Sequence, residues 1–428
     1  GAHGDYFGSF DALANPDEGI AYRNEHRTIT LSQQFALTPH LSSQLTLGWQ
    51  RYDNSFDILL APSGYLVGFA PTLPEYPNGW NAYGFAREQQ LQGSADFRWS
   101  GWTKHQIFAS IAATNIDITK AWQAGNADPD TTLPLADYQL FTGDKNWLDE
   151  NKQRDIRSLV LQDEYIATPK TTYTLGVRYD DYSDVGDNLS PRLAGVYRHT
   201  DEHIFKAQFA EAFRPPTFYE EWNSTAQSID PETIRTFEIG YVHRLWNRVD
   251  RITLFHSRMR DLIIFEGLLD YKNLHGAKVS GVELESESYL FEWMKLNANL
   301  SYSDAENTDT GNSIAGTAQW LSNIGIMMNH NSGTTFSIDL NYVGQRKREP
   351  IDTRESLGSY YTINTTLTYT TPDTPVTLRI GIKNLLDREI RYPAAMTWDN
   401  LSSSYMESYS NDYPQPGRSG WIQFDYQF

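Results

Sequence analysis

The sequence predicts an all-β protein, a transmembrane antiparallel β-barrel of the bacterial outer-membrane type. Three observations lead to this prediction. Many segments alternate apolar and polar side chains, the connections between them alternate between short and long, and no run approaches the roughly 18 consecutive apolar residues of a membrane helix. Aromatic residues make up 14% of the chain and hydrophobic residues only 39%, which suits half-buried strands better than a large helical core.

Apolar or aromatic side chains occupy every second position in segments spread along the whole chain. The clearest of these segments are 44–49, 172–179, 335–342, 376–383 and 422–428. Successive side chains of a strand point to opposite faces, so each segment has one apolar and one polar face. The polar faces are too polar for the core of a soluble sandwich. Lipid on one side and an aqueous lumen on the other account for both faces.

The last alternating segment runs to the final residue, Phe428. We expect this closing strand to pair with the first strand of the barrel, because an open edge in hydrocarbon leaves backbone groups without hydrogen bonds. The apolar alternates Leu378, Ile380, Ile422, Phe424 and Tyr426 are expected to face lipid.

Short and long connections alternate between the strands. Turn residues mark short connections at 38–40, 168–170, 199–202, 331–333 and 371–375. Long segments rich in Gly, Asn, Asp and aromatic residues lie at 59–82, 123–150, 215–232, 305–316 and 392–415. A soluble sandwich or propeller would have shorter and more even spacing. We count about 17–18 strands, many of them long enough to cross a bilayer at a tilt.

Several motifs in the second half of the chain resemble those of TonB-dependent outer-membrane receptors. They are FAEAFRPPTFYEEW (209–222), DPETIRTFEIGYVHRL (230–245), NLHGAKVSGVELESE (273–287), IKNLLDREIRYP (382–393) and the closing GRSGWIQFDYQF. Each is weak alone, but together they occur in the order that this family shows. The resemblance implies the family's fold, a wall of about 22 strands around a plugged lumen.

Single residues in these motifs have structural interpretations. Arg214, beside two prolines, is expected to fix a strand end. Gly276 and Gly281 are expected to allow close strand packing or a bulge. Asn384 and Asp387 are expected to satisfy backbone groups at a strand end.

The sequence departs from the family because no N-terminal plug and no TonB-box peptide is recognisable in it. We therefore interpret residues 1–428 as a partial barrel, with the plug and about the first four or five strands of a 22-stranded wall upstream. A complete passive porin of about eighteen strands is the alternative.

Composition excludes several classes of function. The net charge of −19 leaves no basic face for nucleic acid, and the absence of cysteine rules out disulfides and thiolate metal sites. No nucleophile elbow, zinc-type histidine spacing, phosphate loop or dinucleotide fingerprint occurs. We therefore expect no catalytic residues and no enzyme activity. An outer-membrane lipase would need Ser, His and a polar orienting group together on the outer wall.

Aromatic and arginine side chains in or beside the long segments are the candidates for ligand binding. They are Tyr65, Tyr76, Trp80, Tyr83, Tyr138, Trp147, Arg214, Tyr219, Trp222, Trp398, Tyr405 and Tyr409. Aromatic faces stack on flat, partly apolar ligands, and an arginine beside them adds charge recognition. Aromatic residues also form girdles at membrane interfaces and pack on one another in loops, so the same residues fit structural roles.

The resemblance implies a receptor that imports a scarce nutrient, most often a ferric siderophore, with energy from the TonB complex acting through the plug. A corrinoid, an oligosaccharide, a passive porin and an adhesion or assembly barrel remain alternatives. Haem is disfavoured because no histidine lies between Phe209 and Val242, where haem receptors of this family commonly carry one. The implied location is the outer membrane, where lipid and lipopolysaccharide are partners together with the small-molecule metal chelate.

We predict no cofactor and no metal site. The acidic run Asp304, Glu306 and Asp309 offers oxygen ligands that suit Ca²⁺, but a solvated group of charges is the favoured interpretation.

Overall fold

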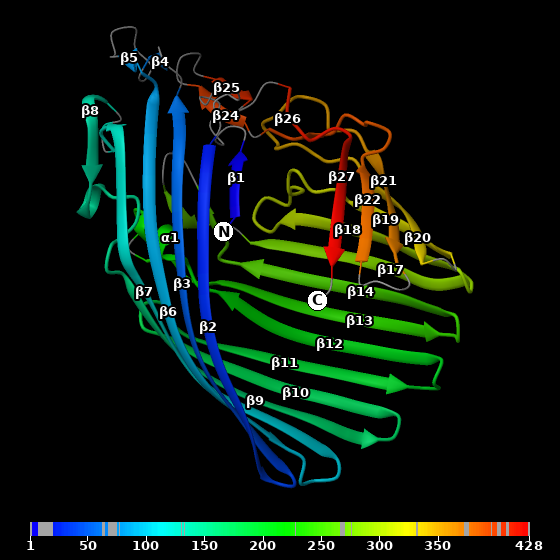
Figure 1. Ribbon diagram of the computed structural model, residues 1–428. Helices are drawn as coiled ribbons and strands as arrows, with labels where there is room; N and C mark the ends of the chain where they lie inside the picture. Colours follow the sequence, from blue (N-terminus) through cyan, green and yellow to red (C-terminus); the bar gives the residue numbers. More distant parts are fainter. Residues whose placement is uncertain are drawn as a thin grey trace.

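One large antiparallel sheet forms most of the protein, and small two-stranded sheets lie in the long connections (Figure 1). The computed structural model describes residues 2–6, 20–61, 65–66, 75–76, 78–129, 131, 133–226, 228–265, 270–274, 276–330, 333–371, 376–394, 396–399, 404–407 and 411–426. Within these residues, no helix is both long enough and apolar enough to cross a membrane.

The wall strands follow one another in chain order. They are β1 (Ala2–Tyr6), β2 (Ile20–Thr38), β3 (Leu41–Ala61), β6 (Trp80–Trp99), β7 (His105–Ala127), β9 (Gln153–Thr168), β10 (Thr171–Tyr182), β11 (Gly186–Arg198), β12 (His203–Arg214), β13 (Glu232–Arg244), β14 (Arg248–Arg260), β17 (Ala277–Phe291), β18 (Met294–Asn307), β19 (Trp320–His330), β20 (Thr334–Val343), β21 (Tyr360–Thr370), β22 (Val376–Lys383) and β27 (Ser419–Tyr426).

Smaller elements lie in the long connections. They are β4 (Tyr65–Leu66), β5 (Glu75–Tyr76), β8 (Pro134–Phe141), η1 (Gly143–Lys145), α1 (Phe218–Trp222), β15 (Ile263–Phe265), β16 (Tyr271–Asn273), β23 (Arg391–Tyr392), β24 (Met396–Asp399), β25 (Ser404–Glu407) and β26 (Tyr413–Pro414).

Each wall strand pairs with its neighbours in the chain. Among the described residues, the main sheet has 19 strands, and β8 pairs only with the long-loop end of β7, which leaves 18 strands in the row. This agrees with the predicted 17–18 strands. Among the described residues, the pairings end at β1 and β2 on one side and at β27 on the other, as Figure 1 shows. Phe428, the last residue of the predicted closing strand, lies outside the described residues.

The two faces of the wall have the predicted character. Ile380 lies opposite Ile422, and their side chains are 42% and 74% exposed on one face. On the other face Arg379 lies opposite Gln423 and forms an ion pair with Asp425. Phe424 and Tyr426 share the apolar face with Ile422. The assignment of these alternates to the lipid face is therefore supported by both register and exposure.

The apolar band on the outer face approaches the height of about 25 Å that is typical of outer-membrane barrels. In β13 the outward residues Phe237, Ile239 and Tyr241 lie between Arg235 and His243. Eight residues at about 3.4 Å each span about 27 Å along the strand, or about 20 Å of height at a tilt of about 40°. Arg235 and His243 therefore mark the two interfaces of the band, near the long loops and near the short turns respectively.

Short turns gather at one end of the wall and long loops at the other, as predicted. The exception is the connection between β10 and β11, which comprises only residues 183–185 at the long-loop end. Two further long connections, 261–276 and 344–359, were not among the predicted loops.

Motif residues take the expected structural roles. A Cβ on Gly281 would lie 2.3 Å from the Tyr302 carbonyl oxygen, and one on Gly276 would lie 2.7 Å from the Met259 carbonyl oxygen. Asn384 and Asp387 follow β22 with positive φ values of 48° and 53°. The side-chain amide of Asn384 donates to the Arg388 carbonyl at 2.8 Å and accepts a hydrogen bond from the Arg388 backbone amide at 2.9 Å, so it closes the turn.

Candidate functional site

A single helical turn, α1, follows the arginine-proline motif at the long-loop end. The Thr217 hydroxyl accepts a hydrogen bond from the Glu220 amide at 3.2 Å, and the Glu220 carboxylate accepts one from the Thr217 amide at 2.7 Å. This reciprocal capping satisfies two amides that a helix start would otherwise leave unpaired. The sequence Thr-Phe-Tyr-Glu thus places a short rigid element inside the wall.

Arg214 joins this turn to the next strand. Its Nε donates to Glu232 Oε2 at 2.7 Å, and its Nη1 donates to Glu220 Oε2 at 2.9 Å. The expected role at a strand end is confirmed. Its side chain remains 43% exposed, so its predicted contact with a ligand stays a prediction.

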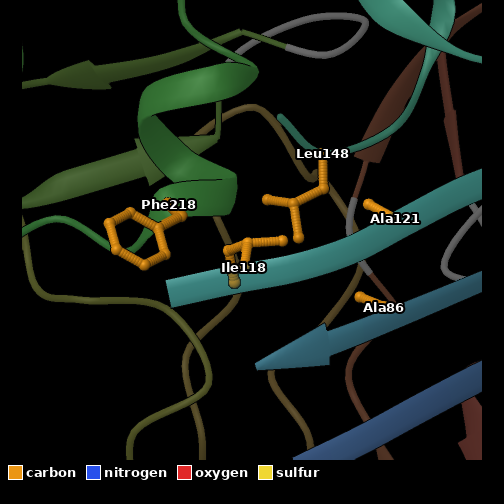
Figure 2. Packing of buried hydrophobic residues seen from close by; sticks show 5 residues of the cluster. All are labelled: Ala86, Ile118, Ala121, Leu148 and Phe218. Atoms are coloured by element: carbon orange, nitrogen blue, oxygen red, sulfur yellow. The ribbon is translucent and has the colours of Figure 1, made fainter. Parts of the chain in front are cut away.

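Phe218 anchors α1 on the inner wall. It forms a buried cluster with Ala86 of β6, Ile118 and Ala121 of β7, and Leu148 of the β7–β9 loop (Figure 2). We call this cluster with its bordering side chains Trp147 and Tyr219 the loop hub. It locks the β12–β13 loop to the β7–β9 loop on the face opposite the lipid band.

Arg154 of β9 ties the loop hub to the wall. Its guanidinium donates to Asp184 at 2.7 Å, to Glu221 at 3.0 Å and to the Pro216 carbonyl at 2.9 Å, and it lies 4.8 Å from the centre of the Phe218 ring. Sequence reasoning missed this residue, because its partners lie about 30 to 67 residues away and no local motif surrounds it.

Two predicted ligand residues, Trp147 and Tyr219, belong to the loop hub, and a third, Trp222, contacts the β7–β9 loop beside it. The indole of Trp147 donates to the Trp122 carbonyl at 3.1 Å, and the indole of Trp222 donates to the Asn146 carbonyl at 2.8 Å. Burial raises the pKa of the Tyr219 phenol. The centres of the Tyr219 and Trp147 rings lie 5.9 Å apart. These contacts show that the three side chains hold loops together, while their contact with a ligand is untested.

Another group of predicted residues comes from the β3–β6 loop, the start of β6 and β8. Tyr76 is only 1% exposed and stacks on Trp80 with ring centres 5.4 Å apart, and burial raises the pKa of Tyr76 to about 12. Tyr83 contacts Tyr138, which is 50% exposed. Tyr138 therefore presents the most accessible aromatic surface of this group.

The remaining predicted aromatic residues are placed by backbone alone. Tyr65 lies opposite Tyr76 in the β4–β5 pair, and Trp398 lies opposite Tyr405 in the β24–β25 pair. Tyr409 falls outside the described residues.

A second group of loop contacts, centred on Asp412, was not predicted. The Asp412 carboxylate accepts hydrogen bonds from Arg348 at 2.6 and 2.7 Å and from the Ala394 amide at 3.0 Å. The neighbouring Arg348 guanidinium holds the pKa of Asp412 down, at about 2. Arg354 bonds Asp352 at 2.6 Å and contacts Asp412 at 3.4 Å. This Asp412 clamp joins the 344–359 loop to the 384–418 loop.

Arg346, beside the clamp, carries a charge without a carboxylate partner among the described residues. Its guanidinium lies 5.1 Å from the ring centre of Tyr360 and 5.5 Å from that of Tyr392. The residue is only 6% exposed, and its Nε lacks a hydrogen-bond partner within the part of the chain that the structure describes. Burying an unpaired cation is costly, so this arrangement favours an incoming anion. The run Gln-Arg-Lys-Arg at 345–348, in a chain of net charge −19, is the sequence signal that could have identified it.

The acidic run does not converge on a common point. Asp304 accepts a hydrogen bond from Gln319 at 3.0 Å, whereas Glu306 pairs with Lys278 at 2.7 Å. Within the described ranges, the only group of three or more close side chains of metal-ligating type is Glu202, His203 and His243, at the short-turn end. The alternative of a calcium site at the acidic run therefore gains no support from geometry.

A wall with one apolar face, one polar face and long loops packed over the lumen defines an outer-membrane barrel of the receptor class. Residues 2–385 match the family model described as "TonB dependent receptor-like, beta-barrel". The chain belongs to this family and lies in the bacterial outer membrane, with its long loops facing outward and its short turns facing the periplasm.

Similar proteins in the comparisons are receptors and transporters. The ferric enterobactin receptor PirA of Pseudomonas aeruginosa is 22% identical over 64% of this chain and 41% of its own length. The vitamin B12 transporter BtuB of Vibrio cholerae is 23% identical over 68% of this chain and 47% of its own length. The chain thus spans somewhat less than half of these relatives. It is part of a receptor family and not of an enzyme family.

Solved structures share the fold. The copper transporter OprC superposes with a TM-score of 0.73 at 14% identity, covering 96% of this chain and 66% of its own. The ferric yersiniabactin uptake receptor FyuA of Yersinia pestis superposes with a TM-score of 0.66 at 16% identity, covering 95% of this chain and 62% of its own.

Proposed function

We propose that the protein containing this chain is a TonB-dependent receptor that imports a scarce nutrient, with a ferric siderophore as the favoured cargo. The match to the receptor family supports a function in transport. Arg346 is the observation that favours an anionic cargo. A buried guanidinium that lies over the rings of Tyr360 and Tyr392 combines positive charge with aromatic neighbours, which suits an anionic aromatic chelate. Similarity to receptors named for ferric enterobactin points the same way.

The twelve predicted loop residues form the rest of the proposed binding face. Exposed Tyr138 and the partly exposed guanidinium of Arg214 are the members best placed to touch a ligand directly. Trp147, Tyr219 and Trp222 act mainly by keeping the loops in place. No catalytic residue and no resident cofactor belongs to this proposal.

An upstream plug is proposed to fill the lumen and to transmit the pull of the TonB complex. A concave region of about 620 Å³ near the periplasmic turns is lined by polar groups, including His40, Arg98, Gln106, Gln162 and Glu164, and by apolar groups, including Leu41, Trp99, Ile107 and Phe108. Such a mixed surface is suited to contact with a folded domain. The open edges at β2 and β27 are proposed to be closed by additional strands, because unpaired backbone groups are not tolerated in hydrocarbon.

Lipopolysaccharide is the proposed lipid partner at the outer interface. Arg258 lies opposite both Arg235 and Lys278, so three exposed cations stand side by side on neighbouring strands above the apolar band. Glu211 and Glu306 pair with the two outer cations, at 2.8 and 2.7 Å. Like charges directly opposite each other are unfavourable, and an anionic phosphate of the outer leaflet would relieve that repulsion.

Ligand titration of the intact receptor tests the proposed cargo. Intrinsic tryptophan fluorescence can be followed against a panel of ferric siderophores, corrinoids and oligosaccharides, with Arg346→Ala compared with Arg391→Ala. Arg391 is a suitable control because it is already paired with Glu389 at 2.6 Å. We expect an anionic chelate to bind and Arg346→Ala alone to weaken binding at least tenfold.

Two outcomes would reject the proposal. If Arg346→Ala and Arg391→Ala bound the chelate with equal affinity, Arg346 would have no role in binding it. Uptake that continues without TonB, together with no binding across the panel, would favour the passive porin.

A further inference from the structure

Two histidines face each other across neighbouring strands at the periplasmic end of the wall. His203 begins β12, and its register partner in β13 is His243. The Arg244 amide donates to the Glu202 carbonyl at 2.8 Å, which makes His203 and His243 a pair without mutual backbone hydrogen bonds. Side chains approach each other most closely in pairs of this kind.

The side chains gather around a common point. The two imidazole rings are nearly parallel, with centres 5.0 Å apart and an interplanar angle of 13°. The carboxylate of Glu202, from the turn before β12, joins them, and one potential ligand atom from each of the three residues lies within 4.8 Å of the others. The structure thus presents two nitrogen ligands and one oxygen ligand.

Neighbouring groups hold the imidazoles in place. The Nδ1 atom of His203 lies 2.6 Å from the Tyr241 hydroxyl, and the Nδ1 atom of His243 lies 3.7 Å from the Asp250 carboxylate. Each ring therefore has a polar neighbour at one nitrogen and retains a second nitrogen. Metal-bound histidines commonly have this arrangement, in which an outer group orients the ring while the other nitrogen binds the ion.

The position allows access from water. His203 and His243 lie on the outer face just below Phe205 and Tyr241, the lower border of the apolar band. Glu202 is exposed in the periplasmic turn, and both histidines are partly exposed. An ion can reach the group without crossing the lumen or the lipid.

We propose that Glu202, His203 and His243 bind a divalent transition-metal ion of the zinc class at the periplasmic rim. Imidazole nitrogens with one carboxylate suit Zn²⁺, Cu²⁺ or Ni²⁺, whereas Ca²⁺ and Mg²⁺ prefer oxygen ligands throughout. Bonds of about 2.0–2.1 Å would draw the ligand atoms to roughly 3.3 Å from one another, with water in the remaining position. The bound ion links β12 to β13 at their periplasmic ends and is separate from any cargo captured by the outer loops.

Metal titration of the intact receptor, purified in detergent and freed of metal, tests this site. Zn²⁺ binding is measured by calorimetry, and the ligands are identified from the Cu²⁺ electron paramagnetic resonance spectrum. We expect one site, with nitrogen couplings from two imidazoles. His203→Ala and His243→Ala should each weaken Zn²⁺ binding about tenfold or more, and Glu202→Gln should weaken it less.

His256→Ala is the matched control. His256 lies on the same outer face in β14 and bonds Ser280 at 2.8 Å, outside the cluster. Its loss should leave Zn²⁺ binding unchanged. Heat-modifiable migration on gels confirms that each variant is folded, and His203→Asn with His243→Asn provides a second pair if an alanine variant fails to fold.

The proposal is overturned if the folded histidine variants bind Zn²⁺ as tightly as the wild type, or if the wild type binds none at high micromolar concentration. Siderophore binding measured on the same variants should not change. A failure of the metal site is therefore distinguishable from a failure of the proposed cargo.

Discussion

Both terminal nitrogens of the Arg348 guanidinium donate hydrogen bonds to the carboxylate of Asp412, at 2.7 and 2.6 Å. The two residues are 64 positions apart in the chain. Both side chains are 9% exposed. Such a bidentate pair is stronger and more directional than a single surface contact. It joins two long loops between which the described part of the chain shows no direct strand pairing.

At neutral pH, Asp412→Asn should destabilise the contact between the two loops by about 2 kcal/mol. A pKa lowered from 3.8 to about 2 corresponds to a free energy of that order. Because the folded pKa is depressed, this stability is present above about pH 4 and is lost as pH falls through about 2. Hydrogen exchange of the Arg346 and Leu357 amides, which bond each other's carbonyls, reports loop opening.

In the wild type, the protection of these amides from exchange should therefore fall between about pH 4 and pH 2. In Asp412→Asn, their protection should change little over the same pH range. Glu389→Gln is the control, because Glu389 is 72% exposed in the same loop. Identical pH profiles of wild type and Asp412→Asn would contradict the assignment.

Ile380→Arg should impair assembly far more than Arg379→Ile. Ile380 lies on the lipid face, where an arginine near mid-membrane costs about 2 to 4 kcal/mol, whereas Arg379 faces the lumen and loses only its pair with Asp425. Folding yield into lipid vesicles and heat-modifiable migration measure the difference. Equal tolerance of the two substitutions would show that the faces are reversed or undefined.

Gly281→Ala should destabilise the wall by about 1–3 kcal/mol through overpacking. An added Cβ would lie 2.3 Å from the Tyr302 carbonyl oxygen and 2.6 Å from the ring of Phe255. Gly358→Ala is the control, since a Cβ added at Gly358 would have nothing within 4 Å of it. Urea midpoints in detergent or vesicles should fall for the first variant only, and an unchanged midpoint for Gly281→Ala would mean that β17 and β18 can separate freely.

Phe218→Ala should release the β12–β13 loop from the loop hub, because removal of a buried phenylalanine costs about 3–5 kcal/mol. We expect faster protease cleavage in residues 215–231 while the wall stays folded. Phe265→Ala, at a side chain that is 51% exposed, should have little effect. Unchanged cleavage of the Phe218 variant would indicate that Arg154 and Arg214 suffice to hold α1.

The features that the sequence predicted correctly depend on residues that are close to one another in the chain. Alternation at Ile422, Phe424 and Tyr426 predicted which face meets lipid, because each strand carries its own period of two. The motif around Arg214 likewise predicted a strand end, since Glu220 and Glu232 follow within 18 residues. The roles of Asn384 and Gly281 also followed from residue type and position.

The sequence by itself determined the fold class, the order of the strands, the lipid face and the end that carries the long loops, because each of these depends on short-range periodicity and turn chemistry. Only the tertiary structure decided which loop residues meet. The guanidinium of Arg346 lies over the rings of Tyr360 and Tyr392, and Arg348 bonds Asp412, through loop packing. His203 faces His243 through strand register. A charged residue in a loop has many partners within reach of the flexible chain, and closure of the surrounding wall selects one of them.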